Sequence, residues 1–148
     1  MIVRAVTAED RNQWEPLWSG YNSFYGRTLP EQITDVTWAR FLHPDEPVHA
    51  LVAERDGALV GLAHYLFHRS TILISPTCYL QDLFTAESAR GQGAGHALIE
   101  GVYQRAKEGG AARVYWHTRE TNATAIKLYD SIAERSGFIV YRKIFESQ

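Results

Sequence analysis

A glycine-rich turn past the middle of the chain constrains this sequence more than any other feature. Residues 90–95 read Arg-Gly-Gln-Gly-Ala-Gly, between an apolar run over 78–84 and an amphipathic helical pattern from about Gly95. Glycine lets a backbone approach a ligand closely because no Cβ intervenes. At a helix N-terminus the unpaired N–H groups and the helix dipole favour phosphate oxygens, and Arg90 adds a forked positive charge. The sequence therefore predicts a strand-to-helix turn that binds a pyrophosphate.

Two common phosphate-binding loops do not fit this turn. A Walker loop requires Lys-Ser or Lys-Thr after its last glycine, and His96-Ala97 stands there instead. A dinucleotide fingerprint requires the spacing G-x-G-x-x-G, whereas this turn reads G-x-G-x-G. A flexible turn without a ligand is the alternative interpretation, but Arg90 together with three glycines weighs against it.

The bulk properties favour one globular domain over residues 1–148. The chain has 148 residues, 45% of them hydrophobic and 22% charged, with a net charge of −2 and no basic tract. We therefore expect no nucleic-acid partner. No apolar stretch approaches the ~20 residues of a membrane span, and the N-terminus lacks a signal pattern, so we expect a cytoplasmic protein without a membrane partner.

The single cysteine and the histidines offer no evident metal or disulfide chemistry. Cys78 lies in an apolar run and excludes an intrachain disulfide. His64 and His68 are four residues apart in an expected strand, ~13 Å by strand rise, which is too far for one metal site. We therefore expect no metal.

Hydrophobic periodicity predicts an α/β domain with a mixed sheet. Asp56-Gly57 between two apolar runs is a strong hairpin signal. Gly109-Gly110 and Gly137 are predicted to cap helices. Strands are expected over 2–6, 49–54, 58–67, 78–84, 113–118 and 138–145, and helices between Thr7 and Gly26 and over 31–42, 95–108 and 122–135.

Four motifs in this order resemble the GNAT superfamily of acetyl-CoA-dependent N-acetyltransferases. They are Tyr-Leu-Gln-Asp-Leu-Phe over 79–84, the turn at 90–95, Asn122 with Leu128-Tyr129-Asp130, and Gly137-Phe138. The first motif and the spacing from Tyr129 to Gly137 most resemble the fungal histone and polyamine acetyltransferases and the spermidine/spermine acetyltransferases. The resemblance covers essentially the whole chain.

The resemblance implies a fold and a co-substrate site. The expected fold is a mixed, mostly antiparallel central sheet flanked by helices, in which two splayed parallel strands, 78–84 and 113–118, bind acetyl-CoA. The residues implied in acetyl-CoA binding are Leu83, Phe84, Thr85, Arg90, Gly91, Gln92, Gly93, Ala94, Gly95, His96, Asn122 and Tyr129.

Two residues are candidates for the catalytic proton transfers. Asn122 and Tyr129 are two helical turns apart and share one face, so the Tyr129 hydroxyl can protonate the departing CoA thiolate. Because a lysine-like amine with a pKa of ~10.4 is almost fully protonated at pH 7, a base is also needed. Asp82, a carboxylate in an apolar strand, is the first candidate, or else the partner of a buried hydroxyl or amide. Gln81 cannot act as a base and is expected to bind substrate.

Four further residues are expected near the acceptor: Tyr21, Tyr25 and Trp38, where the family builds its acceptor pocket, and His117, at the end of a cleft strand. Core or lid packing is the alternative for the three aromatic residues, and an ordinary strand-end histidine is the alternative for His117. The predicted function is direct acetyl transfer to a primary amine, such as a polyamine or a lysine side chain in a small molecule or peptide. The alternative is a non-catalytic acyl-CoA-binding sensor. Homodimers are common among relatives, so a homodimer is also expected.

Overall fold

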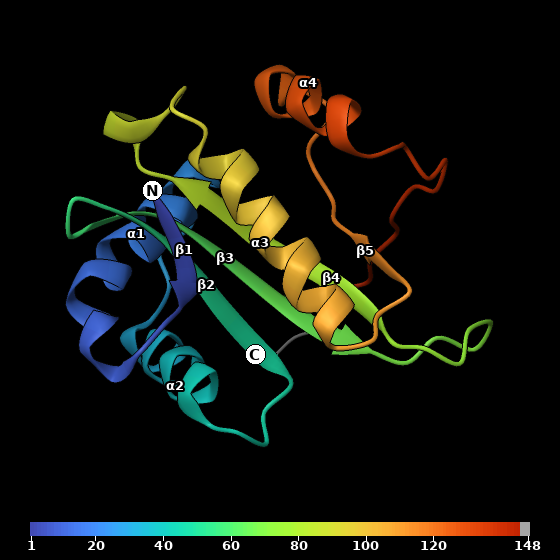
Figure 1. Cartoon of the computed structure of the whole chain (residues 1–148), viewed down its shortest axis with the longest axis horizontal. Coiled ribbons are helices and arrows are strands. Elements are labelled where there is room, and N and C mark those ends of the chain that lie inside the picture. The colour runs from blue at the N-terminus through green and yellow to red at the C-terminus, as the bar shows by residue number, and fades with distance from the viewer. Residues whose placement is uncertain (146–148) are drawn as a thin grey trace. The chain divides into compact units, whose positions relative to one another are not determined.

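A five-stranded mixed sheet forms the centre of residues 1–117 in the computed structural model, which describes residues 1–145 (Figure 1). Its strands lie in chain order: β1 (Ile2–Ala5), β2 (Val48–Arg55), β3 (Ala58–His68), β4 (Thr77–Thr85) and β5 (Arg113–Tyr115). Neighbouring strands are antiparallel except β4 and β5, which are parallel. The expected mixed, mostly antiparallel sheet with one parallel pair is confirmed.

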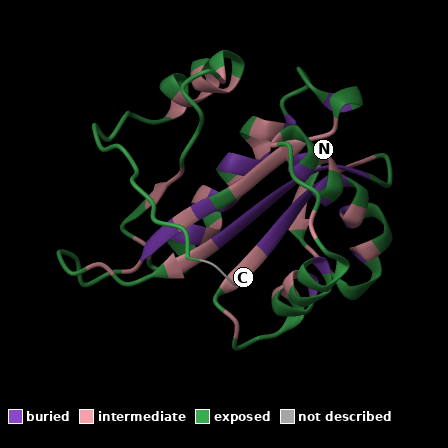
Figure 2. Ribbon diagram, turned by 180° about the vertical axis from the view of Figure 1, so that it is seen from behind, coloured by how far each residue is buried: buried purple, intermediate pink, exposed green. Residues whose placement is uncertain are grey.

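Helices cover both faces of this sheet. Alternate residues of β3 point to opposite sides, so each side of the strand contacts different helices. Leu62 joins an aromatic core with Trp14 and Trp38, which come from α1 (Arg11–Phe24) and α2 (Glu31–Leu42). On the opposite side a Cβ at Gly61 would meet Leu98 of α3 (Ala94–Glu108) at 3.0 Å. Figure 2 shows the buried residues gathered in the middle strands. No helix within residues 1–145 is long and apolar enough to cross a membrane.

Local signals in the sequence set several of the turns. Asp56 (φ 53°) and Gly57 (φ 81°) both adopt the left-handed conformation that a two-residue type I′ hairpin needs, so this prediction is confirmed. Gly110 (φ 77°) ends α3, where its N–H bonds the Lys107 carbonyl at 3.0 Å and Ala111 N–H bonds the Ala106 carbonyl at 2.9 Å. The predicted left-handed helix cap is therefore present.

Residues 118–145 form a separate compact unit around one helix, α4 (Ala123–Ile132). The prediction of a helix to residue 135 capped by Gly137 is wrong, because α4 ends five residues before that glycine. Near its end the Ser131 hydroxyl donates to the Leu128 carbonyl at 2.6 Å, a local bond that competes with helical hydrogen bonding.

The predicted last strand over 138–145 is also absent. These residues have no regular secondary structure, and Phe138 and Tyr141 are each 88% exposed. A strand needs a neighbouring edge for its N–H and C=O groups, and β-branched and aromatic composition alone does not provide one. The alternation of apolar residues over 138–145 therefore predicted a strand that does not form.

Candidate active site

A β-bulge in β4 decides which way Asp82 points. His64 of β3 pairs with Asp82, but the next residue, Tyr65, pairs with Leu80, so Gln81 is an extra residue in β4. Side chains normally alternate between faces, which would place Leu80 and Asp82 on the same side. The extra residue moves Asp82 to the opposite side, the one that carries α1. Gln81 itself is exposed.

On the α1 side, each ring nitrogen of His64 has one hydrogen-bond partner, Asp82 or Trp14. His64 Nδ1 lies 2.9 Å from Asp82 Oδ2, and the Trp14 indole N–H donates to His64 Nε2 at 3.1 Å. The His64 ring also packs against Trp18 and Phe41, with centroids 5.1 and 4.5 Å away. His64 is 4% exposed and the Asp82 side chain 12% exposed, so this acid lies at the edge of an aromatic core.

Tyr21 of α1 reaches the same carboxylate. Burial, and then the charge and hydrogen bonding of Asp82, raise the pKa of the Tyr21 phenol well above its usual value. The raised pKa keeps the Tyr21 hydroxyl protonated at any physiological pH. The sequence placed Tyr21 among the acceptor-pocket candidates and considered His64 only as a metal ligand, while Trp14 was expected as a helix residue and not as part of the site. The available signal was that His64 shares its face of β3 with Leu62, the face that packs on the aromatic residues of α1.

The glycine-rich turn has the conformation that close ligand approach requires. It follows a short helical turn, η2 (Glu87–Ala89), and leads into α3. Gly91 (φ 76°) and Gly93 (φ 86°) are left-handed, and an added Cβ at either would meet nothing within 4 Å. The first helical bond runs from Ala97 N–H to the Gly93 carbonyl at 3.0 Å, so the preceding N–H groups lack intrahelical acceptors. Arg90 is exposed beside them, its guanidinium 5.7 Å from the Phe84 ring centroid.

One edge of β4 offers backbone groups next to this turn. Its pairing with β5 covers only Thr77 to Tyr79, while β4 continues to Thr85. On its other edge, residues 83–85 pair with β3. The groups of residues 80–85 that face away from β3 are therefore without a strand partner in the described sheet. The expected strand over 113–118 is shorter than predicted, since β5 ends at Tyr115.

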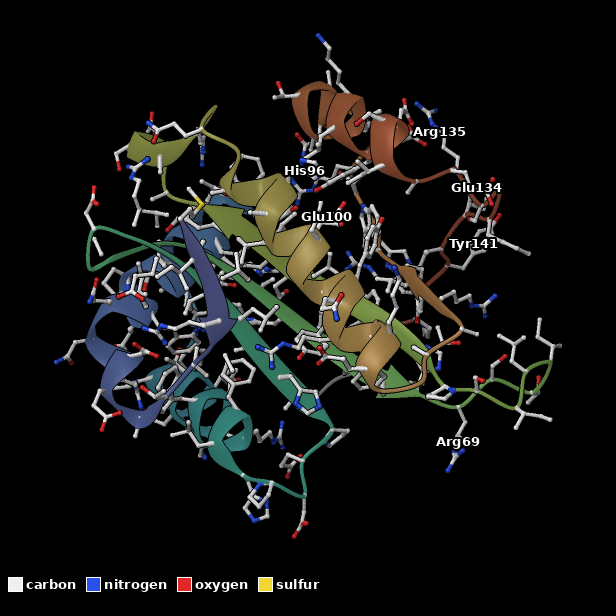
Figure 3. The ribbon with its side chains drawn as sticks, in the orientation of Figure 1. Arg69, His96, Glu100, Glu134, Arg135 and Tyr141 are labelled. Carbon is white, nitrogen blue, oxygen red and sulfur yellow. The ribbon has the colours of Figure 1, made fainter. Side chains whose placement is uncertain are left out.

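The other predicted residues occupy varied surroundings. His96 and Glu100 pair on the first turns of α3, with 3.3 Å between His96 Nε2 and Glu100 Oε1 (Figure 3). His117 is exposed and its Nδ1 lies 3.2 Å from the Tyr79 hydroxyl. Tyr25 is half-buried at the end of α1. Trp38 is 6% exposed and packs 4.8 Å from Trp14 between centroids, so it lies in the core.

Within residues 118–145, Asn122 and Tyr129 lie on the same short helix. Asn122 is the N-cap residue of α4, and its N–H bonds the Arg119 carbonyl at 3.0 Å. Both side chains are half-buried. The predicted placement of Asn122 at the opening of this helix is confirmed.

Sequence comparison identifies the family. Residues 12–133 match the Acetyltransferase (GNAT) family. This chain belongs to the GNAT acetyltransferases. It is 34% identical over 145 residues to the D-amino-acid N-acetyltransferase HPA3 of Saccharomyces cerevisiae, covering 97% of this chain and 90% of that protein.

Solved structures share this fold along the whole chain. A probable acetyltransferase matches with a TM-score of 0.87 and 26% identity, covering 100% of both chains. The aminoglycoside acetyltransferase AAC(6')-Iy, solved with a CoA-containing bisubstrate analogue, matches with a TM-score of 0.84 and 18% identity, covering 97% of each. The GNAT chain is thus an acetyltransferase that uses acetyl-CoA as co-substrate and an amine as acceptor, which favours the enzyme over the binding sensor.

Proposed function

We propose that Asp82 is the general base of this acetyltransferase and that Tyr129 protonates the departing CoA thiolate. The observation that carries the proposal is the bulge at Gln81, which presents Asp82 to the α1 side with a hydrogen-bond partner on its Oδ2 atom. An acceptor ammonium must lose a proton before its nitrogen can attack the thioester carbonyl. Asp82 accepts that proton directly or through water.

Acetyl-CoA is held by the turn and by the free edge of β4. The open left-handed glycines and Arg90 fit a pyrophosphate, and the unpaired backbone of β4 fits the amide groups of a pantetheine arm. Asn122 hydrogen-bonds the same arm. The proposed binding residues are Leu83, Phe84, Thr85, Arg90, Gly91, Gln92, Gly93, Ala94, Gly95, His96, Asn122 and Tyr129.

The acetyl group passes directly to the amine, without a covalent enzyme intermediate. Cys78 is the only thiol, and its side chain is fully buried. Burial raises its pKa to about 11, which keeps it protonated and unreactive. Cys78 also pairs with Phe67, on the α3 side of the sheet, whereas Asp82 faces α1.

The acceptor is a small primary amine. Polyamines and lysine side chains follow from the resemblance of residues 79–84 and 129–138 to the polyamine branch. The yeast relative is a D-amino-acid N-acetyltransferase, which adds free amino acids to the candidate acceptors. Gln81, Tyr25 and His117 are proposed to contact the acceptor, and buried Trp38 supports that region by packing.

The proposal extends to one acetyltransferase domain over 1–148, a cytoplasmic location and a homodimer. Exposed apolar side chains favour self-association, among them Ile74, Phe138 and Tyr141. Sedimentation velocity measures the homodimer directly.

Thiol release from acetyl-CoA over an amine panel tests the catalytic roles. We expect Asp82→Asn to lower kcat by about 100-fold or more with unchanged acetyl-CoA affinity, because a positioned base contributes ~10²–10⁴-fold. Tyr129→Phe should also lower kcat. Asp45→Asn, at an exposed site, is the matched control. Wild-type kcat in Asp82→Asn would overturn the base assignment.

A further inference from the structure

Arg27 follows the last turn of α1 and is turned back over it by a glycine cap. Gly26 is left-handed (φ 70°), its N–H bonds the Ser23 carbonyl at 3.0 Å, and Arg27 N–H bonds the Asn22 carbonyl at 2.8 Å. These two bonds form a Schellman motif, which reverses the chain direction at a helix end. The start of the Arg27 side chain is therefore fixed by the backbone.

The Arg27 guanidinium is held in place although the residue is exposed. Its Nε donates to Asn22 Oδ1 at 3.2 Å, and the 4%-exposed Asn22 is itself fixed by a 2.9 Å bond from Nδ2 to the Trp18 carbonyl. The guanidinium carbon lies 5.7 Å from the Tyr21 ring centroid and 5.3 Å from that of Tyr25. An arginine whose geometry is set in advance loses little entropy when it binds a ligand.

Among the described residues 1–145, no carboxylate forms an ion pair with this guanidinium. The ion pairs found within residues 1–145 use Arg4, Arg11 and Arg135 as their arginines. Arg27 uses its Nε–H for a bond to the neutral amide of Asn22. Its two Nη groups form a fork of donors with the geometry that matches the two oxygens of a carboxylate.

The Tyr21 ring lies between Arg27 and the proposed base. The Arg27 guanidinium carbon is 5.7 Å from the Tyr21 ring centroid, and Tyr21 stacks on Trp18 at 5.6 Å. The Trp18 ring is 5.1 Å from that of His64, which bonds Asp82 at 2.9 Å. The charge of Asp82 also raises the pKa of the Tyr21 phenol. A negative and a positive group thus flank one aromatic cluster. An amine held at Asp82 has its neighbouring substituent within reach of Arg27, and a second ammonium there, as in a polyamine, would be repelled.

We infer that Arg27 binds the carboxylate of the acceptor, and that the preferred acceptors are free α-amino acids whose amino group lies at Asp82. This inference rests on the proposed function and adds its substrate class. The carboxylate accepts a forked pair of bonds from the Arg27 guanidinium. Arg27 thereby sets which amine reaches the base, while the proton transfer stays with Asp82.

Paired substrates with and without the carboxylate test the inference. We would measure kcat/KM for alanine, alaninamide and spermidine, each corrected to equal free-amine concentration. Hydrogen bonds to charged groups are worth ~1.5–3 kcal/mol, so Arg27→Gln should lower kcat/KM for alanine by about 10- to 100-fold. The value for alaninamide should change little, and Arg27→Lys should restore part of the loss. Arg40→Gln, at an exposed site on α2, is the matched control.

The outcomes separate this inference from the proposed function. Turnover of alaninamide or spermidine as fast as alanine, unchanged in Arg27→Gln, would overturn the carboxylate site and leave the acetyltransferase mechanism intact. Equal losses on alanine and alaninamide would also overturn it, because they indicate general damage to the site. Absence of turnover with every amine of the panel would overturn both.

Discussion

The neighbours of His64 determine which of its two ring nitrogens carries the proton. An indole N–H can only donate, so the 3.1 Å contact from Trp14 makes His64 Nε2 an acceptor. The remaining nitrogen, Nδ1, then carries the proton and donates it to Asp82 across 2.9 Å. Trp14 thereby fixes one neutral form of the ring, which holds the Asp82 carboxylate in orientation without neutralising its charge.

Substituting His64 should therefore affect the reaction through Asp82. We expect His64→Ala to lower kcat by about 10-fold or more with unchanged acetyl-CoA affinity, because the loss of one bond to a charged group costs ~1.5–3 kcal/mol. His64→Asn, whose amide can replace the Nδ1–H donor, should recover part of it. Two-dimensional ¹H–¹⁵N spectra of the ring should show the Nδ1–H tautomer in the wild-type protein. The Nε2–H tautomer there would contradict the assignment.

At the level of elements, the junction of β4 with α3 depends on backbone conformation. Gly93 precedes α3 at φ 86° and Gly110 follows it at φ 77°, and both have open space where a Cβ would stand. Both glycines adopt the left-handed conformation, one at each end of the same helix. Only Gly93 belongs to the turn proposed to bind pyrophosphate.

This symmetry gives a matched pair of variants. Gly93→Ala and Gly110→Ala should each destabilise the fold by about 1–2 kcal/mol, the cost of a left-handed non-glycine residue. Gly93→Ala alone should also weaken acetyl-CoA binding. Urea unfolding and calorimetric titration with acetyl-CoA measure the two effects. Equal acetyl-CoA affinity in both variants would remove the turn from the proposed site.

For residues 1–117 as a whole, a charged cluster ties the first helical turn to the sheet. Arg4 of β1 donates to both Asp10 oxygens at 2.7 and 2.9 Å and to Glu54 of β2 at 3.0 Å. Thr7 N–H adds a 2.7 Å bond to Asp10 Oδ2. The Arg4 hydrogen bond, partly opposed by burial, lowers the pKa of Asp10 to about 2.

The free energy of unfolding should depend on pH through Asp10. Because its pKa is lower in the folded than in the unfolded chain, the ionised carboxylate stabilises the fold above about pH 5, by about 2 kcal/mol. This contribution falls as the pH decreases through about 2, with about half left at pH 3. Urea unfolding of the wild type and Asp10→Asn at pH 7 and pH 3 measures it. A stability difference between the two proteins that does not shrink with acid would contradict the linkage.

Local signals explain which features of the fold the sequence predicts correctly. The hairpin at Asp56-Gly57, the cap at Gly110 and the bounds of α2 depend on the conformations of a few adjacent residues. The turn at 90–95 belongs to the same class, since alternate glycines before an amphipathic helix describe its geometry. These are short-range preferences, and they persist in the folded chain.

The sequence by itself determined the GNAT family, through short motifs in a fixed order along the chain, and the left-handed glycines of the turn at 90–95, because each motif is a local pattern. It also singled out Asp82 as a carboxylate within an apolar strand. Only the tertiary structure decided what surrounds that carboxylate. The bulge at Gln81 arises from pairing between β3 and β4, and His64 lies 18 residues from Asp82 in the chain but 2.9 Å away in space. Residues 138–145 fail for the same reason, since a strand exists only where another strand completes its hydrogen bonds.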